Sequence, residues 1–389
     1  MVFMHGIELC KKFHFEFVEP LLSIHFPNLS YSSALIGPGS EVLGYDTEMS
    51  TDHDWGPRVV IFLQAGDLEL VNEIRQALQT NRPEHFYGYP VDLNQTVITS
   101  LAPFLESKLS FDFTKSPEPL VWLAFPSQSL AEIVGGEVFR DDLGHLTTIR
   151  KQLKYYPHDI WLYLMASVWN RIGQEEHLVL RAGYVGDEFG SSIIGSRLVR
   201  DMMNLCFLME RQYAPYPKWF GTDFKKLDCA DELLPMLMQA QSAVTWKTRE
   251  NALCEAYEGL ARMHNRLGIS EWMNELVSPF FDRPYKVIQG GTFADAIARQ
   301  ITDPIIRKLS QIRLIGGIDQ ITDNTDFRLI SQWVTGEQST ERSIIRMLYN
   351  KIPEELYGGE VGAKEIPRVL AAVKHFLPVL PLSYYLYPL

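Results

Sequence analysis

The sequence has 389 residues, which is long for a single hydrophobic core and suggests two or three domains. Hydrophobic residues make up 46% and charged residues 22%, which are ordinary values for a globular protein, so we expect no long stretch of disorder. The formal net charge of −12 argues against an extensive nucleic-acid surface, because binding many phosphates requires clustered Lys and Arg. A small anionic ligand held locally, together with a metal ion, is compatible with this charge.

The four cysteines are far apart, and none belongs to a C-x-x-C pair or lies at metal-ligand spacing from a histidine. We therefore expect reduced structural thiols in a cytoplasmic protein. The N-terminal residues lack the charged start and apolar stretch of a signal peptide, and no apolar window has the length of a bilayer-spanning helix. We expect no membrane partner. The cysteines are Cys10, Cys206, Cys229 and Cys254.

Strands and helices alternate in the first third of the chain. Short apolar runs rich in branched residues predict strands, and a stripe of apolar residues at helical spacing predicts an amphipathic helix. The expected strands are residues 33–37, 58–63 and 97–101, and the expected helices are residues 6–17, 40–45 and 67–79. This order predicts an α/β or α+β layer.

The pattern becomes almost entirely helical from residue 145 onward. In residues 191–213, for example, apolar side chains recur at every third or fourth position, which buries one face of a helix. The other expected helices are residues 145–155, 159–180, 230–243 and 245–267. We therefore predict an α+β domain over residues 1–145, a helical bundle over 146–270 and a mostly helical extension over 271–389.

The segment between the first two predicted strands carries the residues with the clearest chemical use. Gly39 allows its backbone to approach a phosphate closely, and Ser40 offers a hydroxyl group at the start of a short helix. Asp52 and Asp54 are two residues apart just before the second strand, so on an extended backbone both carboxylates point the same way. Such a pair can hold one or two Mg²⁺ ions, which phosphoryl and nucleotidyl transfer require.

A turn rich in Ser, Thr and Asp is the structural alternative for this segment. Ser50, Thr51, Asp52 and Asp54 all favour capping and turn formation. Two carboxylates this close repel each other unless a cation compensates them, and a metal ion or Arg58 is expected to do so.

This segment resembles the glycine-serine and paired-aspartate signature of the polymerase-beta-like nucleotidyltransferase superfamily, especially its minimal and aminoglycoside-type members. The strings GSEVLGYD, STDHDWGPR and YAPYPKW are also similar, over most of the chain, to a bacterial family catalogued only as a domain of unknown function. The resemblance implies a small mixed sheet followed by helices, with ATP or another nucleoside triphosphate at Gly39 and Ser40. It also implies two Mg²⁺ ions on Asp52 and Asp54, and transfer of AMP or another nucleoside monophosphate to a hydroxyl of a small molecule or protein.

Two departures from the signature leave turnover open. His53 separates the aspartates where an apolar residue is usual, and a Trp-Gly-Pro break follows them. The third carboxylate expected on the third strand has no counterpart in residues 97–101. Asp92 and Glu137 are candidates to complete the site, although Asp92 is also a good turn residue.

Lys218 lies in the aromatic segment after a long predicted helix, and similar aminoglycoside enzymes use a lysine of their helical domain to bind the triphosphate. Its alternative is a surface lysine whose stem covers neighbouring rings. The sequence thus predicts a metal-dependent nucleotidyltransferase. A nucleotide-binding regulatory or antitoxin-like protein with little or no catalysis is the alternative.

Overall fold

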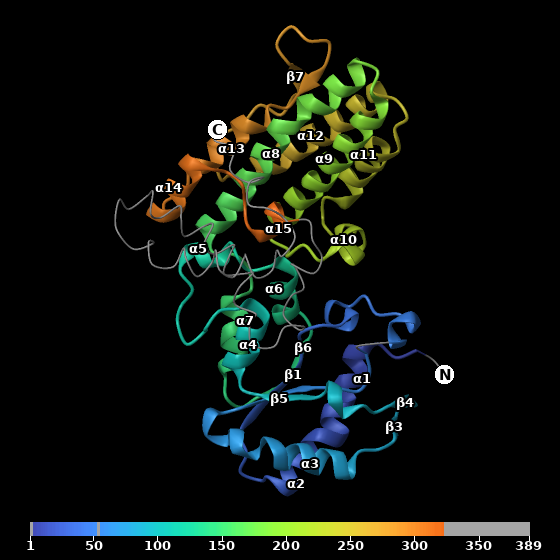
Figure 1. Ribbon diagram of the computed structural model, residues 1–389, viewed down its shortest axis with the longest axis vertical. Coiled ribbons are helices and arrows are strands. Elements are labelled where there is room, and N and C mark those ends of the chain that lie inside the picture. Colours follow the sequence, from blue (N-terminus) through green and yellow to red (C-terminus); the bar gives the residue numbers. More distant parts are fainter. Residues whose placement is uncertain (1–2, 53–54, 323–389) are drawn as a thin grey trace, which may run out of the picture. The chain divides into compact units, whose positions relative to one another are not determined.

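The computed structural model describes residues 3–52 and 55–322, all of which belong to one compact unit. It has a small mixed sheet with helices around it, followed by a large helical region (Figure 1). This architecture confirms the predicted α+β class. The boundaries at residues 145 and 270 stay predictions, and the expectations for His53, Asp54 and residues 323–389 lie outside the described residues.

The central sheet has four short strands in the order β5-β2-β1-β6. The strands are β1 (Tyr31–Leu35), β2 (Val60–Leu63), β5 (Val97–Thr99) and β6 (Glu137–Asp141). Strand β1 is antiparallel to both β2 and β6, whereas β2 and β5 are parallel. Every residue of β1 and β2 is buried. Strand β2 is accordingly a continuous apolar run. Strand β1 also buries Ser32 and Ser33, whose hydroxyl groups are hydrogen-bonded to Asp141 and His14.

The N-terminal helices and α3 provide one hydrophobic core of the sheet domain. The α1 residues Leu9, Cys10 and Phe13 are buried at helical spacing, and Phe13 packs in the same cluster as Ile61 of β2 and Ile74 of α3. Helix α1 continues into one turn of π-helix and then into α2. The elements are α1 (Gly6–Phe13), the π-helix His14–Val18, α2 (Glu19–His25), α3 (Val71–Asn81) and the hairpin of β3 (His85–Phe86) and β4 (Tyr89–Pro90).

Three shorter helices lie between β5 and β6, and a fourth follows β6 and leads into the helical region. They are α4 (Leu101–Leu109), α5 (Pro119–Trp122), α6 (Ser127–Val134) and α7 (His145–Gln152). The guanidinium of Arg150 in α7 donates hydrogen bonds to three backbone carbonyls at the C-terminal end of α6, at 2.7 to 2.9 Å. It thereby satisfies acceptors that the helix end leaves without intrahelical partners.

Long helices form the helical region, and its core contains the aromatic residues Trp161, Tyr163 and Trp169. No helix among the described residues has both the length and the apolarity of a membrane span. The elements are α8 (His158–Tyr184), α9 (Glu188–Met209), α10 (Pro217–Phe224), α11 (Ala230–Ser242), α12 (Trp246–Leu267), β7 (Ser278–Pro279), β8 (Lys286–Val287), α13 (Gly290–Ala298), α14 (Pro304–Ile312) and α15 (Ile318–Ile321).

Helices α8 and α13 cross at very short range. The buried Glu176 carboxylate of α8 accepts hydrogen bonds from the backbone N–H groups of Ile288, Gln289 and Gly290, at 2.6 to 3.2 Å. A Cβ atom on Gly290 would lie 2.7 Å from the Trp169 carbonyl oxygen. The crossing therefore depends on a carboxylate that caps α13 and on a glycine at the point of closest approach.

The segment after α14 returns to α8 and is held there through its backbone. The Tyr163 hydroxyl donates to the Arg313 carbonyl at 2.9 Å, and Arg171 Nη1 donates to the Gln320 carbonyl at 3.0 Å. The Ile318 N–H in turn donates to the Leu123 carbonyl beside α5, at 2.8 Å. The described end of the chain is therefore part of the helical core.

Acidification is expected to destabilise this core through His264. The imidazole is buried against Trp169 and Phe293, and burial lowers its pKa to about 4. The folded-state pKa of His264 lies below its unfolded-state pKa. Burial of the neutral imidazole therefore stabilises the protein fully above the unfolded-state pKa, and this stabilisation is lost as the pH falls toward 4. Linkage predicts a loss of about 2 kcal/mol between about pH 7 and about pH 5. Urea unfolding against pH measures it; an equally steep profile in His264→Gln contradicts the assignment.

Candidate functional site

The sheet topology gathers four chain segments at one edge. Because β1 is antiparallel to β2 and β6, the end of β1 lies beside the starts of these two strands, and the start of β5 lies beside that of β2. Gly39 and Ser40 follow β1, the segment that contains Asp52 leads into β2, and Gln95 precedes β5. Segments that are far apart in sequence thus meet at this edge, which we call the turn edge.

The turn at Gly39 needs a glycine for two reasons. Its φ of 129° lies in a region that other residues rarely adopt. A Cβ atom there would overlap the Arg58 guanidinium and lie 2.6 Å from both carboxylate oxygens of Glu41. Ser40 then begins the 3₁₀ helix Ser40–Leu43 and is half-buried. The space beside Gly39 is therefore used by an ion pair of the protein itself.

That ion pair is buried beneath the turn. Arg58 Nη2 donates to the Pro38 carbonyl at 2.5 Å and also to Glu41 Oε1. Burial raises the pKa of Glu41, and the charge of Arg58 opposes that rise. Arg58 was expected to compensate the aspartate pair, and no pattern in the sequence indicated Glu41, which lies two residues after the glycine. Arg58 instead braces the turn through Glu41 and Pro38.

A second buried carboxylate, Asp46, links α1 to the same edge. It accepts hydrogen bonds from the Gly6 N–H at 2.6 Å, from Trp55 Nε1 at 3.1 Å and from His5 Nδ1 at 3.1 Å. This role was not predicted, although Asp46 ends the string GSEVLGYD. Trp55 is thereby fixed in the segment that separates the predicted aspartates from β2.

Asp52 is the last residue of the 3₁₀ helix Glu48–Asp52 and is exposed, whereas Asp54 lies outside the described residues. Turn formation does occur here, since the Thr47 N–H donates to Ser50 Oγ and Thr51 Oγ1 donates to the Glu48 carbonyl. Within residues 3–52 and 55–322, no three His, Cys, Asp or Glu side chains form a group suited to a metal ion. The metal pair, which includes Asp54, stays a prediction.

The two candidates for a third carboxylate have other partners. Asp92 is exposed and accepts a hydrogen bond from the Asn94 N–H at 3.0 Å, which caps a short 3₁₀ helix as its turn preference suggests. Glu137, the first residue of β6, accepts from Lys11 Nζ at 2.5 Å. Strand β5 carries no carboxylate, as the sequence predicts.

A small pocket of about 190 Å³ lies beside the turn. Its lining includes Pro38, Arg58, Gln95 and Lys108. The Lys108 ammonium is buried with the carboxylate of Glu132 in α6, at 3.3 Å. Two cationic side chains therefore line this pocket, and each is paired with a buried carboxylate.

Helix α10, which carries Lys218, contacts the segment that follows the turn. The Trp219 ring stacks on Tyr45 with centroids 5.1 Å apart, and the Tyr45 hydroxyl donates to Asp223. Lys218 itself is exposed, with Nζ 5.0 Å from the centroid of the Trp219 ring. The structure thus places the helix of Lys218 next to the residues that follow Ser40. The Lys218 ammonium group contacts the neighbouring Trp219 ring rather than the turn.

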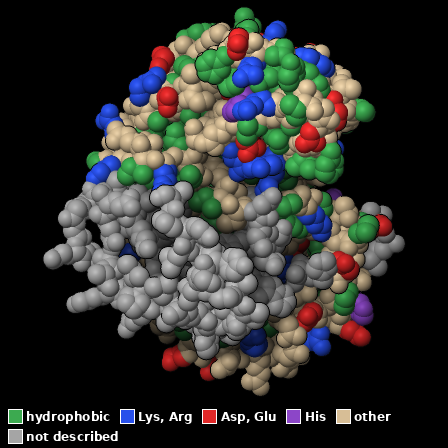
Figure 2. All heavy atoms as spheres, turned by 45° about the horizontal axis from the view of Figure 1, so that its top comes forward, with side chains coloured by type: hydrophobic (Ala, Val, Ile, Leu, Met, Phe, Trp, Pro, Cys, Tyr) green, Lys and Arg blue, Asp and Glu red, His purple; other side chains and the backbone are tan. Residues whose placement is uncertain are grey.

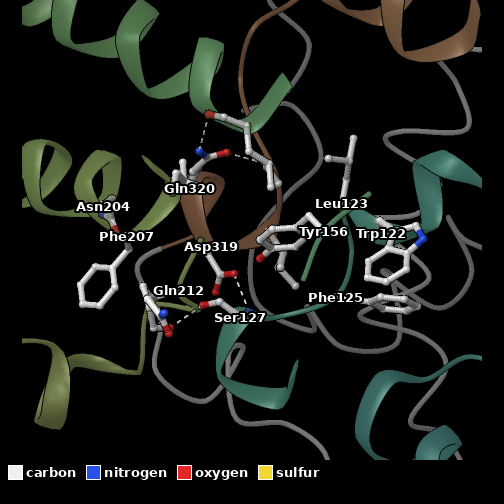
Figure 3. A pocket seen from close by; sticks show the side chains of 15 residues that line it. Trp122, Leu123, Phe125, Ser127, Tyr156, Asn204, Phe207, Gln212, Asp319 and Gln320 are labelled. Carbon is white, nitrogen blue, oxygen red and sulfur yellow. Dashed lines mark hydrogen bonds between the residues drawn. The ribbon is translucent and has the colours of Figure 1, made fainter. Parts of the chain in front are cut away.

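The segment before α10 is tied to the N-terminus of α6. Ser127 Oγ donates to the Ala214 carbonyl at 2.7 Å, and the Tyr216 N–H donates to Gln128 Oε1 at 2.9 Å. Figure 3 shows Ser127 and Gln212 at the lower side of a small cavity that is also lined by aromatic side chains of α5 and α9. These contacts fix the approach of α10 to the turn edge.

Comparisons with known proteins give one family match. A model described as a domain of unknown function (DUF4037) matches residues 122–220, which include Lys218 but neither Gly39 nor Asp52. This agrees with the resemblance to such a family, over a shorter stretch than expected. No curated protein matches the chain. Among solved structures, a nucleotidyltransferase-like protein from Exiguobacterium sibiricum is 13% identical, with a TM-score of 0.30, over 78% of this chain and 91% of that one.

Proposed function

We propose that the protein is a metal-dependent nucleotidyltransferase that moves AMP from ATP to a hydroxyl group of a small molecule or protein. The observation that carries the proposal is the turn edge: the glycine-serine turn follows β1, and the segment that leads from Asp52 into β2 ends beside it. Strands β1 and β2 are direct neighbours, so both segments leave the same end of the sheet, and metal ions held by the second segment would lie on the same side as a triphosphate on the turn.

The proposed roles follow from the chemistry of each side chain. Ser40 and the backbone of the turn would bind phosphate oxygens, while Asp52 and Asp54 would hold Mg²⁺ through oxygen ligands. The bound ions would neutralise charge on the triphosphate and its leaving group. Arg58 and Glu41 would keep the turn in shape, and Lys218 would approach the phosphates from α10.

Asp52→Asn is expected to abolish stabilisation by ATP and Mg²⁺ because it removes a metal-binding carboxylate. A ligand at 100 times its dissociation constant stabilises the native protein by about 2.7 kcal/mol, which gives a measurable rise in melting temperature. Thermal unfolding with and without ATP and Mg²⁺ provides the measurement. Asp282→Asn is the matched control, since Asp282 is an exposed aspartate between β7 and β8 and should keep the full shift.

Absence of a shift in the unaltered protein would refute nucleotide binding. An equal shift in Asp52→Asn would refute the role of this aspartate. Incubation with ATP labelled in the adenosine moiety, followed by a search for label on the protein itself, on lysate proteins and on aminoglycosides, tests the transfer step separately from binding.

A nucleotide-binding regulatory protein with little or no catalysis is the second candidate. This function is favoured because both possible third carboxylates already have partners. Glu137 pairs with Lys11, and Asp92 caps its own turn. A general base for the acceptor hydroxyl would then be missing from these two positions. Saturable ATP binding without transferred label would select this function.

A further inference from the structure

One end of the helical region, at the turn between α8 and α9, exposes large apolar side chains. They come from three segments: the α8–α9 turn with the start of α9, the outer face of α11, and the loop that leads into α12. Figure 2, in which this end is turned forward, shows hydrophobic side chains among charged ones on the helical region. We call the surface formed by six of them, each 50% to 85% exposed, the tip patch: Tyr184, Val185, Phe189, Ile193, Met238 and Val244.

Contacts between the three segments make the tip patch continuous. The buried guanidinium of Arg249 donates to Ser191 Oγ at 2.8 Å and to the Ala243 carbonyl at 2.6 Å. This joins the first turn of α9 to the loop before α12. Gln241 Nε2 donates to Ser196 Oγ at 2.9 Å, which joins the end of α11 to α9. The six side chains therefore lie on one surface instead of being scattered over the helical region.

The α8–α9 turn is held rigidly beneath this surface. Asp187 Oδ1 accepts a hydrogen bond from the Gly190 N–H at 2.7 Å and so caps α9. The Tyr184 and Trp246 rings lie edge to face, with centroids 6.3 Å apart, which packs the end of α8 against the start of α12. A preformed surface loses little conformational entropy when it associates with a partner.

The area of the tip patch suits one side of a protein–protein interface. Since a large apolar side chain presents roughly 150–250 Å² when fully exposed, the six side chains together offer about 700 Å². The largest apolar patch of a typical monomeric protein measures about 300–600 Å². A stable interface buries about 800 Å² on each partner. The tip patch is therefore larger than a monomer usually exposes and close to what a stable complex requires.

The charges around the tip patch favour a second copy of the chain as the partner. Residues 181–193 and 238–247 carry two acidic side chains, Asp187 and Glu188, and two basic ones, Arg181 and Lys247, so their net charge is zero. An anionic lipid surface would favour an excess of basic side chains. Two copies of a chain with a net charge of −12 repel each other over most of their surfaces, and a neutral apolar surface minimises this repulsion.

We propose that the protein forms a two-fold symmetric dimer through the tip patch. In such a dimer the same surface lies on both sides of the axis, so the acidic and basic side chains at its border can face their opposites. Phe189, an aromatic side chain in the middle of the patch sequence, would be buried at the contact, where aromatic residues contribute most to binding. The tip patch shares no residue with the turn edge.

Sedimentation velocity of the full-length protein tests the proposal, and a dimer is expected at micromolar concentration. Phe189→Asp should raise the dissociation constant of the dimer about 100-fold or more, because a two-fold axis buries the new charge twice. Phe189 is 78% exposed in the first turn of α9, where an aspartate interacts favourably with the helix dipole. The substitution is therefore not expected to disturb folding, which circular dichroism checks.

Ile24→Asp is the matched control. Ile24 lies in α2, outside the tip patch, and is 76% exposed, so the substitution places the same charge at a similarly exposed apolar position. It should leave the dimer intact. The proposal is overturned if the unaltered protein sediments as a monomer, if Phe189→Asp remains dimeric, or if Ile24→Asp dissociates the dimer to the same extent.

Hydrogen exchange of the unaltered protein provides a test that needs no substitution. On dilution below the dissociation constant, exchange of the backbone amides of residues 184–193 should accelerate, because they lose the cover of the second copy. Exchange in residues 19–25 of α2 should stay the same. Unchanged exchange in residues 184–193 while the protein dissociates would place the interface elsewhere and overturn the proposal. These measurements are made without nucleotide and are independent of the response to ATP and Mg²⁺ at Asp52.

Discussion

Arg58→Met is expected to lower the free energy of unfolding by about 3–5 kcal/mol, because it leaves the buried carboxylate of Glu41 without its cation. Glu41 is 1% exposed, and Arg58 also donates to the Pro38 carbonyl inside the turn. The substitution therefore removes a charge partner and a backbone hydrogen bond at the same position. Equilibrium unfolding in urea, followed by circular dichroism, measures the loss.

The double variant Glu41→Gln/Arg58→Met separates the charge effect from the packing effect. An uncharged amide is less costly to bury than an unpaired carboxylate, so the double variant should be more stable than Arg58→Met alone. If the single variant lost less than about 1 kcal/mol, the pair would behave like an exposed one. This result would contradict the burial of the Arg58–Glu41 ion pair beneath the turn.

Gly290→Ala is expected to lower the free energy of unfolding by about 3 kcal/mol, at the upper end of the cost of overpacking a core. A Cβ atom at this position would lie 2.7 Å from the Trp169 carbonyl oxygen and 2.8 Å from the Gly173 nitrogen. Both neighbours are backbone atoms of α8, so helices α8 and α13 would have to move apart. The same movement would weaken the cap that Glu176 provides.

The adjacent glycine of α13 provides an internal control for this prediction. A Cβ atom on Gly291 would meet no atom within 4 Å, and alanine favours a helix over glycine by up to about 1 kcal/mol. Gly291→Ala should therefore be neutral or stabilising in the same urea experiment. Equal effects of the two substitutions would refute the close crossing of α8 and α13.

The helices were largely predictable because their periodic patterns are local. Apolar residues at every third or fourth position in residues 191–213 anticipated α9, which spans Glu188–Met209. The short helices α5 and α6 were not anticipated, and neither was the return of the chain after α14. These depend on contacts such as that between the Ile318 N–H and the Leu123 carbonyl, for which the local sequence carries no signal.

The candidate site was predictable in its turn and not in its supporting residues. Gly39 and Ser40 were expected between the first strand and a short helix, and Gly39 adopts a positive φ there. That Glu41 would be buried against Arg58 follows from the antiparallel pairing of β1 and β2, a non-local event. The same holds for Asp46, whose partners come from α1 and from Trp55. The geometry of Asp52 with Asp54 stays a prediction.

The return of the chain after α14 also has a consequence for biosynthesis. Ser127 and Asp319 are 192 residues apart, and Tyr163 and Arg313 are 150 apart, so α6 and α8 leave the ribosome long before their partners. Until then, Tyr163, Asn170 and Arg171 lack the carbonyl groups that they bind in the native protein. Contacts over such separations form slowly. A nascent chain stopped before residue 312 should therefore bind chaperones more strongly than one that includes the returning segment.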